Sequence, residues 1–372
     1  MARIDSLRMR AGQIFCACDI DGLPLDLDAL PKESSLFRMA LAFGASVFAQ
    51  VLTLSVLPLA SASFGLASGA LPWPYMALLL GAALAAFPAS ILLDRLGRQT
   101  AFALGASLGL AGGLLAAVAL FERLYPVFIV GLLWLGMAQG FSLFYRHAGA
   151  MAGHAAGLIF AAGLSGAFAA PFMIEFITEQ AGPLSSPSLF ALAGLANLVT
   201  LAVAIGLPGR HIEITAQSDL IKRPPTVSVI SATIIAGLAW LVMTGVMAHA
   251  PLAMNGCGLS FSMSAIGMAV HLSAMYLPGF TIGRMVMHFG ASMTALIGLI
   301  LLLMGSASVL YQATLLGFVI SLAVAGYGWG MATIGATAAL HRSGHPSASV
   351  LALHDIILFL SALAGAAAFG RL

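Results

Sequence analysis

Long apolar runs separated by short polar gaps dominate the chain. Each run is about twenty residues long, which is the length that crosses a bilayer as a helix. Nothing alternates like the strands of a membrane barrel, and lipid offers no partner for an open sheet edge. The pattern therefore predicts an all-α polytopic membrane protein. The predicted spans cover residues 37–60, 73–93, 100–121, 125–145, 153–174, 188–207, 227–249, 261–286, 292–310, 313–339 and 349–370.

Two polar stretches divide these runs and predict the domain organisation. Residues 1–36 form a polar tail of mixed charge, without a cleavable signal, that we expect to be cytoplasmic. Residues 208–226 are the longest later interruption and predict a cytoplasmic linker. The linker separates an N-terminal six-helix half at 37–207 from a C-terminal half of about five helices at 227–372. A twelfth span is not evident.

Composition and charge agree with this layout. The 372 residues are 61% hydrophobic and 8% charged, whereas about a quarter of the residues in a soluble domain are charged. Of the fifteen Lys and Arg residues, only Arg123 and Arg371 fall on the side opposite the N-terminus. This bias predicts a cytoplasmic N-terminus. Nothing in the sequence indicates a catalytic constellation or a nucleic-acid partner, so we expect no enzyme.

The two halves have similar sequences at one short loop. "SILLDRLGRQ" follows the second span and "GRMVMHFGAS" follows the eighth, which is the corresponding span of the second half. Aligning Gly97 with Gly290 places Asp94 opposite Met287 and Arg95 opposite His288. Two homologous helical halves are the construction of one large class of secondary transporters.

The loop "SILLDRLGRQ" resembles the cytoplasmic signature of the major facilitator superfamily. Ser90 stands where that family usually has Gly, and Gln99 where it often has a basic residue. The resemblance implies the major facilitator fold and leaves the substrate open. It also implies a conformational latch that pairs with neighbouring helix ends, whereas the alternative is that the basic residues only set topology. The motif residues are Ser90, Asp94, Arg95, Gly97 and Arg98.

Methionine and histidine residues recur at helical spacing in the seventh and eighth spans. Met243 and Met247 share one helix face, as do His271 and Met275. The two spans are consecutive and antiparallel, so both pairs are expected at similar depth in the outer half of the membrane. Thioethers and imidazole together suit Cu(I). The alternative is that methionine merely fills the core.

These four residues also resemble the paired signature of the CcoA-like copper importers, a bacterial branch of the major facilitator superfamily. The resemblance implies that they bind copper as a transported substrate, with no permanently bound cofactor. It implies a multi-pass protein of the bacterial inner membrane that supplies copper for cbb-type cytochrome oxidase, with periplasmic or cytoplasmic copper chaperones as partners. Cys257 resembles a family cysteine and is a candidate secondary ligand.

Further histidines and cysteines offer weaker candidates. His147, Met151 and His154 are expected to share a helix face near the cytoplasmic side and to pass copper inward, unless they lie in a solvated loop. Cys16 and Cys18 lie in the N-terminal tail and could bind Cu(I), although such tails are more often disordered.

The last span carries the only carboxylate that we expect well inside a span. Asp355 and its neighbour His354 lie in the predicted cytoplasmic third, and Arg146 is a plausible partner from the first half. Intramembrane ionisable residues mark proton relays or ion pairs. The sequence leaves open whether this group is an inner gate latch or a proton-coupling site.

Import of copper by alternating access is the leading function hypothesis. The alternative is a small-molecule carrier for riboflavin uptake or drug efflux, since relatives of the same branch are linked to riboflavin import. That alternative predicts aromatic partners such as Trp240 and Phe261 facing the cavity. A sensor or assembly factor without transport is a third possibility, against which the lack of a sizeable soluble domain counts.

Overall fold

The computed structural model describes residues 33–65, 73–150, 155–207, 226–342, 344 and 346–369. The chain divides into units 1–31 and 32–372, and the described residues belong to the second unit. Cys16 and Cys18 of the predicted tail, and residues 208–225 of the predicted linker, therefore lie outside the described part. The two-half domain division stays a prediction.

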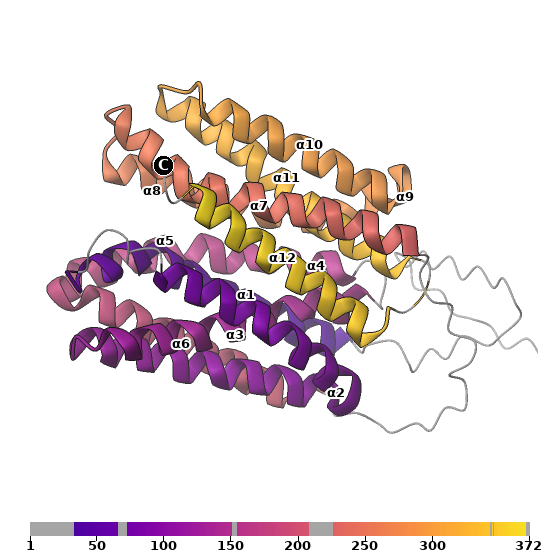
Figure 1. The fold of residues 1–372 in the computed structure, drawn as a ribbon, viewed down its shortest axis with the longest axis horizontal. Coiled ribbons are helices and arrows are strands. Elements are labelled where there is room, and N and C mark those ends of the chain that lie inside the picture. The colour runs from indigo at the N-terminus through magenta and orange to yellow at the C-terminus, as the bar shows by residue number, and fades with distance from the viewer. Residues whose placement is uncertain are drawn as a thin grey trace, which may run out of the picture. The chain divides into compact units, whose positions relative to one another are not determined.

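All regular structure in the described part of the chain is helical (Figure 1). The longer helices are α1 Glu33–Ala62, α2 Trp73–Phe121, α3 Tyr125–Ala150, α5 Gly163–Ala181, α6 Ser185–Ile205, α7 Thr226–Gly256, α8 Phe261–Tyr276, α10 Ala291–Val309, α11 Leu315–His341 and α12 Ala348–Phe369. The shorter ones are α4 Ala155–Ala161, α9 Ile282–Phe289 and the 3₁₀ turns η3 Gly182–Leu184 and η4 Leu277–Phe280.

Nine helical segments of the described residues are long and apolar enough to cross a membrane. Two of them, Trp73–Phe121 and Ala155–Ile205, contain 49 and 51 residues. At about 1.5 Å per residue each is long enough for two crossings of a bilayer core about 30 Å thick. Gly97 breaks the first, and η3 interrupts the second. The described residues thus have the length for eleven crossings, and their all-helical structure confirms the predicted all-α polytopic fold.

Gly97 and Gly290 hold the same backbone conformation at the aligned loops. Gly97 has φ 83° and ψ 179°, and Gly290 has φ 80° and ψ 156°. A side chain at this positive φ and extended ψ would be strained, so the position requires glycine. Each glycine turns the chain from one crossing into the next. The shared geometry agrees with the predicted alignment of the two loops.

Helices from before residue 208 pack directly on helices from after residue 225. α12 contacts both α7 and α2, α5 contacts α8, and α4 contacts η4. At the last contact the backbones touch, because a Cβ added to Gly157 would lie 2.7 Å from the Gly279 carbonyl oxygen. Small residues allow such close approach between membrane helices. This seam between the two sets of helices contains the candidate site.

Candidate functional site

A continuous chain of aromatic rings crosses the seam between the two sets of helices. Its eight members come from eight different elements, and all are buried. We call this set the aromatic chain. Its residues are Phe43 (α1), Phe102 (α2), Tyr145 (α3), Phe160 (α4), Trp240 (α7), Tyr276 (α8), Trp329 (α11) and Phe359 (α12).

Ring contacts connect the members without a gap. Phe43 lies 6.1 Å from Tyr276, measured between ring centroids, which joins α1 to α8 across the seam. Phe160 lies 5.0 Å from Tyr276 and 6.0 Å from Trp329. Trp329 in turn lies 5.3 Å from Trp240 at an interplanar angle of 56°. These separations are typical of favourable aromatic pairs.

Three polar atoms of the aromatic chain are buried without a hydrogen-bond partner among the described residues. They are the Tyr145 hydroxyl and the indole N–H groups of Trp240 and Trp329. A buried indole N–H or phenol normally finds a partner, since leaving it unpaired costs about 1–3 kcal/mol. Unsatisfied donors beside flat apolar rings are the groups that an aromatic ligand with acceptor atoms would engage.

A small polar cavity lies within the first set of helices. Its volume is about 20 Å³, and the Gln139 carbonyl oxygen is another buried atom without a partner. The lining residues are Ser46, Ala49, Gln50, Thr53, Leu78, Leu135, Ala138, Gln139 and Asn197. None of these side chains is charged, and neither is any member of the aromatic chain. Both features therefore suit a neutral ligand better than an ionic one.

Met243 and His271 meet in the buried space between α7 and α8. His271 Nδ1 lies 2.7 Å from the Leu322 carbonyl oxygen, which can only accept, so Nδ1 carries the proton. In the neutral ring Nε2 then holds a lone pair, and it lies 3.2 Å from the Met243 sulfur. Two electron-pair donors thus face each other. A second-shell carbonyl of this kind commonly orients a metal-binding histidine.

Of the two predicted pairs, Met243 with Met247 and His271 with Met275, the structure brings one member of each, Met243 and His271, into contact. Met275 is buried and Met247 is partly buried against the core. Cys257 is exposed and donates to the Gln312 carbonyl oxygen at 3.6 Å. It lies fourteen residues beyond Met243, or about 20 Å along a helix, too far to share its ligand shell. The metal roles of these residues stay predictions.

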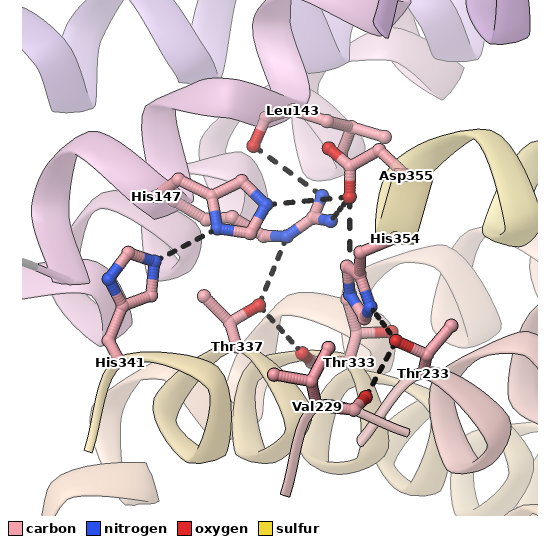
Figure 2. A network of polar contacts seen from close by, with 10 residues as sticks. Leu143, His147, Val229, Thr233, Thr333, Thr337, His341, His354 and Asp355 are labelled. Carbon is pink, nitrogen blue, oxygen red and sulfur yellow. Dashed lines mark hydrogen bonds and ion pairs between the residues drawn. The ribbon is translucent and has the colours of Figure 1, made fainter. Parts of the chain in front are cut away.

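Arg146 and Asp355 form a fully buried ion pair across the seam (Figure 2). One Arg146 Nη donates to Asp355 Oδ1, Nε donates to the Thr337 hydroxyl at 3.1 Å, and the other Nη faces the Leu143 carbonyl. Asp355 is the only buried carboxylate, and Arg146 the only buried Arg or Lys, among the described residues. The partner expected from the sequence is therefore the one observed.

Two further histidines connect the ion pair to the end of the helices. His147 Nε2 lies 3.4 Å from Asp355 Oδ1, and His147 Nδ1 lies 3.2 Å from His341 Nε2. His147 is only 3% exposed, so it does not lie in a solvated loop. Met151 and His154, its predicted companions, lie outside the described residues. His147 is therefore part of this polar network, and its role in passing copper inward stays a prediction.

His354 approaches the same carboxylate from α12 itself. The Thr233 hydroxyl donates to the Val229 carbonyl at 2.8 Å and lies 2.9 Å from His354 Nδ1, within hydrogen-bond distance. His354 Nε2 is left without a hydrogen bond, 4.0 Å from Asp355 Oδ1. The second carboxylate oxygen, Oδ2, also has no hydrogen-bond partner in the described part of the chain, and Figure 2 shows it turned away from the contacts.

The loop motif contacts helix ends within the first set of helices. Arg98 donates to the Ala148 carbonyl at the end of α3, and Gln99 donates to the Ile205 carbonyl at the end of α6. These bonds satisfy carbonyls that a helix C-terminus leaves unpaired. Buried Ser90 donates to the Phe87 carbonyl, while Asp94 and Arg95 are exposed. The hydrogen bonds of Ser90, Arg98 and Gln99 all join helices of the first set, and the latch role of the motif stays a prediction.

Several residues of the site were not found from the sequence. Trp329, Tyr276, Thr337 and His341 all lie in long apolar segments without a distinguishing motif. His341 and Thr337, four residues before it, were only a weak signal in the sequence. Their part in the site depends on the helix that faces them, which the sequence does not give. Phe261, expected to face a cavity, has a side chain outside the described part.

Comparison with known proteins shows similarity to transporters. No known family profile matches the chain. A riboflavin transporter, RfnT of Brucella anthropi, is 28% identical over 297 residues, which cover 75% of this chain and 74% of RfnT. An uncharacterized MFS-type transporter of Bacillus subtilis, YddS, is 27% identical over 319 residues, covering 78% of this chain and 73% of YddS. Both similar proteins are transporters rather than enzymes.

Solved structures show the fold. The chain superimposes on the major facilitator proton:xylose symporter XylE with a TM-score of 0.71 at 15% identity, covering 91% of this chain and 89% of XylE. The human organic anion transporter MFSD10 gives a TM-score of 0.67 at 13% identity, covering 91% and 92%. The chain therefore has the major facilitator fold and is a multi-span membrane protein. The inner membrane and the orientation stay predictions.

Proposed function

We propose that this protein is a major facilitator transporter that carries riboflavin or a closely related flavin across the membrane. The observation that supports this most is the aromatic chain with its unpaired donors, Tyr145, Trp240 and Trp329, where both sets of helices meet. A flavin offers a flat ring for stacking and carbonyl groups that accept from indole N–H. The similarity to RfnT points to the same substrate. Copper import, the leading hypothesis from the sequence, has less support.

The substrate enters when the rings separate. In the described state the rings contact one another, so a bound flavin would replace ring–ring contacts with ring–flavin contacts of comparable strength. The two sets of helices would then rock about this point, as transporters with paired halves do. The absence of charged side chains in the aromatic chain and in the lining of the polar cavity favours a neutral substrate.

The direct test is flavin exchange in vesicles that contain only this protein. Vesicles loaded with unlabelled riboflavin should accumulate labelled riboflavin from outside by counterflow. Trp329→Phe keeps a ring but removes the N–H donor, and it should raise the KM. The matched control is Trp73→Phe, because Trp73 is exposed at the start of α2. Absence of counterflow in the unmodified protein would overturn the proposal.

A second candidate function, copper transport, is favoured by one specific contact. The lone pair of His271 Nε2 faces the sulfur of Met243 at 3.2 Å, and a soft cation between them would satisfy both atoms. If copper is the substrate, His271→Gln and Met243→Leu should each abolish uptake of labelled copper. Flavin counterflow should then be absent and chelation of Cu(I) should stop all flux. Flavin transport that ignores a Cu(I) chelator would eliminate this candidate.

A further inference from the structure

The polar network around Asp355 has room for one additional proton between two buried acceptor atoms. Asp355 Oδ2 and His354 Nε2 are both buried and both lack a hydrogen-bond partner. When the Thr233 hydroxyl gives its one proton to the Val229 carbonyl, His354 Nδ1 carries the proton of the imidazole and donates it to the hydroxyl oxygen. In the neutral ring His354 Nε2 is therefore an acceptor. It lies 4.0 Å from Asp355 Oδ1, so two hydrogen-bond acceptors face each other with no proton between them. A single added proton would relieve this arrangement.

A row of histidines leads from the end of the helices to this carboxylate. His341 is the last residue of α11 and is partly exposed, whereas Asp355 lies seven residues, or about 10 Å, inside α12. His341 Nε2 can donate to His147 Nδ1, and His147 Nε2 can donate to Asp355 Oδ1. Each imidazole can take a proton on one nitrogen and release another from its second nitrogen. The row therefore has the order of a proton relay.

The proton would act on one buried polar contact between the two sets of helices. Asp355 Oδ1 accepts from Arg146, and this is the buried ion pair that joins α3 to α12. Adding a proton to the carboxylate removes its charge and leaves Arg146 with only neutral partners, the Thr337 hydroxyl and the Leu143 carbonyl. The attraction between α3 and α12 falls accordingly. Proton occupancy and separation of the helices are thus linked.

We propose that Asp355, with His354, binds the proton that drives transport, and that His341 and His147 deliver it. The proposal rests on the proposed function in one respect, since a neutral substrate gains nothing from the membrane potential and needs a coupled ion to accumulate. In each transfer a proton leaves His147 Nε2 for the carboxylate, His147 Nδ1 takes one from His341 Nε2, and His341 Nδ1 takes one from water that enters at the end of α11. The rings then return to their first tautomers before the next proton.

The surroundings of Asp355 contain the groups that this coupling needs. The titratable groups facing it in the described structure are Arg146 and His147 from α3 and His354 from α12, with His341 of α11 behind His147. α7 supplies the neutral Thr233 hydroxyl to His354. No hydrogen bond or ion pair from the described part of α2 to Asp355 is found. No three His, Cys, Asp or Glu side chains of the described residues are placed to hold a metal ion.

The first test measures proton binding without any substrate. Infrared difference spectra between acidic and alkaline buffer should contain the C=O stretch of a buried protonated carboxyl group, which an ionised carboxylate does not give. The band should disappear in Asp355→Asn, which keeps the size of the side chain, and should move in Asp355→Glu. It should persist in Glu179→Gln, because Glu179 is an exposed carboxylate on α5. A band that survives in Asp355→Asn would overturn the proposal.

The second test separates proton coupling from flavin transport itself. In vesicles with an imposed pH gradient, the unmodified protein should concentrate riboflavin, and a protonophore should abolish the accumulation. Asp355→Asn should lose accumulation yet keep counterflow, because counterflow needs no net proton movement. His147→Gln should slow accumulation more than counterflow, whereas exposed His288→Gln should change neither.

The outcomes of the second test are distinct. Counterflow without any response to the pH gradient, or accumulation that follows a Na⁺ gradient instead, would overturn the proton site and leave the flavin proposal standing. Absence of all flavin flux would overturn the flavin proposal, and the infrared band would still decide whether Asp355 binds a proton.

Discussion

Arg146 and Asp355, 209 residues apart in the chain, pair in the interior where α3 meets α12. Both side chains are completely buried. A buried pair of this kind contributes little net stability, because the cost of removing two charges from water offsets their attraction. Its position between the two sets of helices therefore fits the proposed proton coupling better than a role in stability alone.

Removal of one partner of this pair should destabilise the protein strongly. Asp355→Ala leaves the Arg146 guanidinium buried without a counter-charge, which typically costs about 3–5 kcal/mol. The double variant Arg146→Met with Asp355→Ala removes both charges and should regain most of the loss. Thermal unfolding in detergent measures both. Equal stability of the single and double variants would show that the pair is not the dominant contact.

The indole N–H of Trp329 should contribute to substrate affinity and not to folding. Trp329→Phe removes a donor without a protein partner, so the free energy of unfolding should hardly change. One lost hydrogen bond to the substrate is worth about 0.5–1.5 kcal/mol, or roughly a two- to tenfold rise in KM. Titration of flavin fluorescence against the purified protein checks this value. An unchanged affinity would place the substrate elsewhere.

Gly97 and Gly290 should resist replacement by any residue with a side chain. Both hold a positive φ with an extended ψ, so alanine at either position should cost about 1–3 kcal/mol. Gly256→Ala is the matched control, because Gly256 ends α7 with open space around it and no positive φ. Thermal stability in detergent should fall for the first two variants only. A neutral Gly97→Ala would contradict the backbone assignment.

The loop motif and the buried ion pair should differ in their effect on transport. Arg98→Ala removes one hydrogen bond to the end of α3 and should lower stability by about 1 kcal/mol or less. Because the hydrogen bond of Arg98 joins α2 to α3 within one set of helices, its loss should leave pH-driven accumulation sensitive to a protonophore. Loss of accumulation with intact counterflow, as expected for Asp355→Asn, would instead assign coupling to the loop.

The apolar periodicity predicted the fold well because the bilayer leaves few solutions. Apolar runs of spanning length must become helices, and the Gly97 and Gly290 loops could be aligned because their glycines are required by the backbone. The pairing of Arg146 with Asp355 was also foreseeable, since an isolated charge inside a membrane demands a partner.

The aromatic chain could not be predicted from the sequence. Trp240 and Trp329 are 89 residues apart, and the significance of each depends on which helices face each other across the seam. The same limit applies to the contact between His147 and His341, because the sequence singled out His147 for another role and did not indicate that α3 and α11 bring the two rings together. Regular Met and His spacing, in contrast, was conspicuous in the sequence, and it favoured copper over the flavin substrate that the ring geometry supports.

The central claim is that the aromatic chain carries a flavin, and counterflow in purified vesicles tests it most directly. Labelled riboflavin and labelled copper are offered together to vesicles loaded with both unlabelled compounds, with and without a Cu(I) chelator. We predict accumulation of riboflavin that is weakened by Trp329→Phe, retained in Trp73→Phe and unaffected by the chelator. Accumulation of copper without riboflavin, abolished by His271→Gln, would contradict this claim.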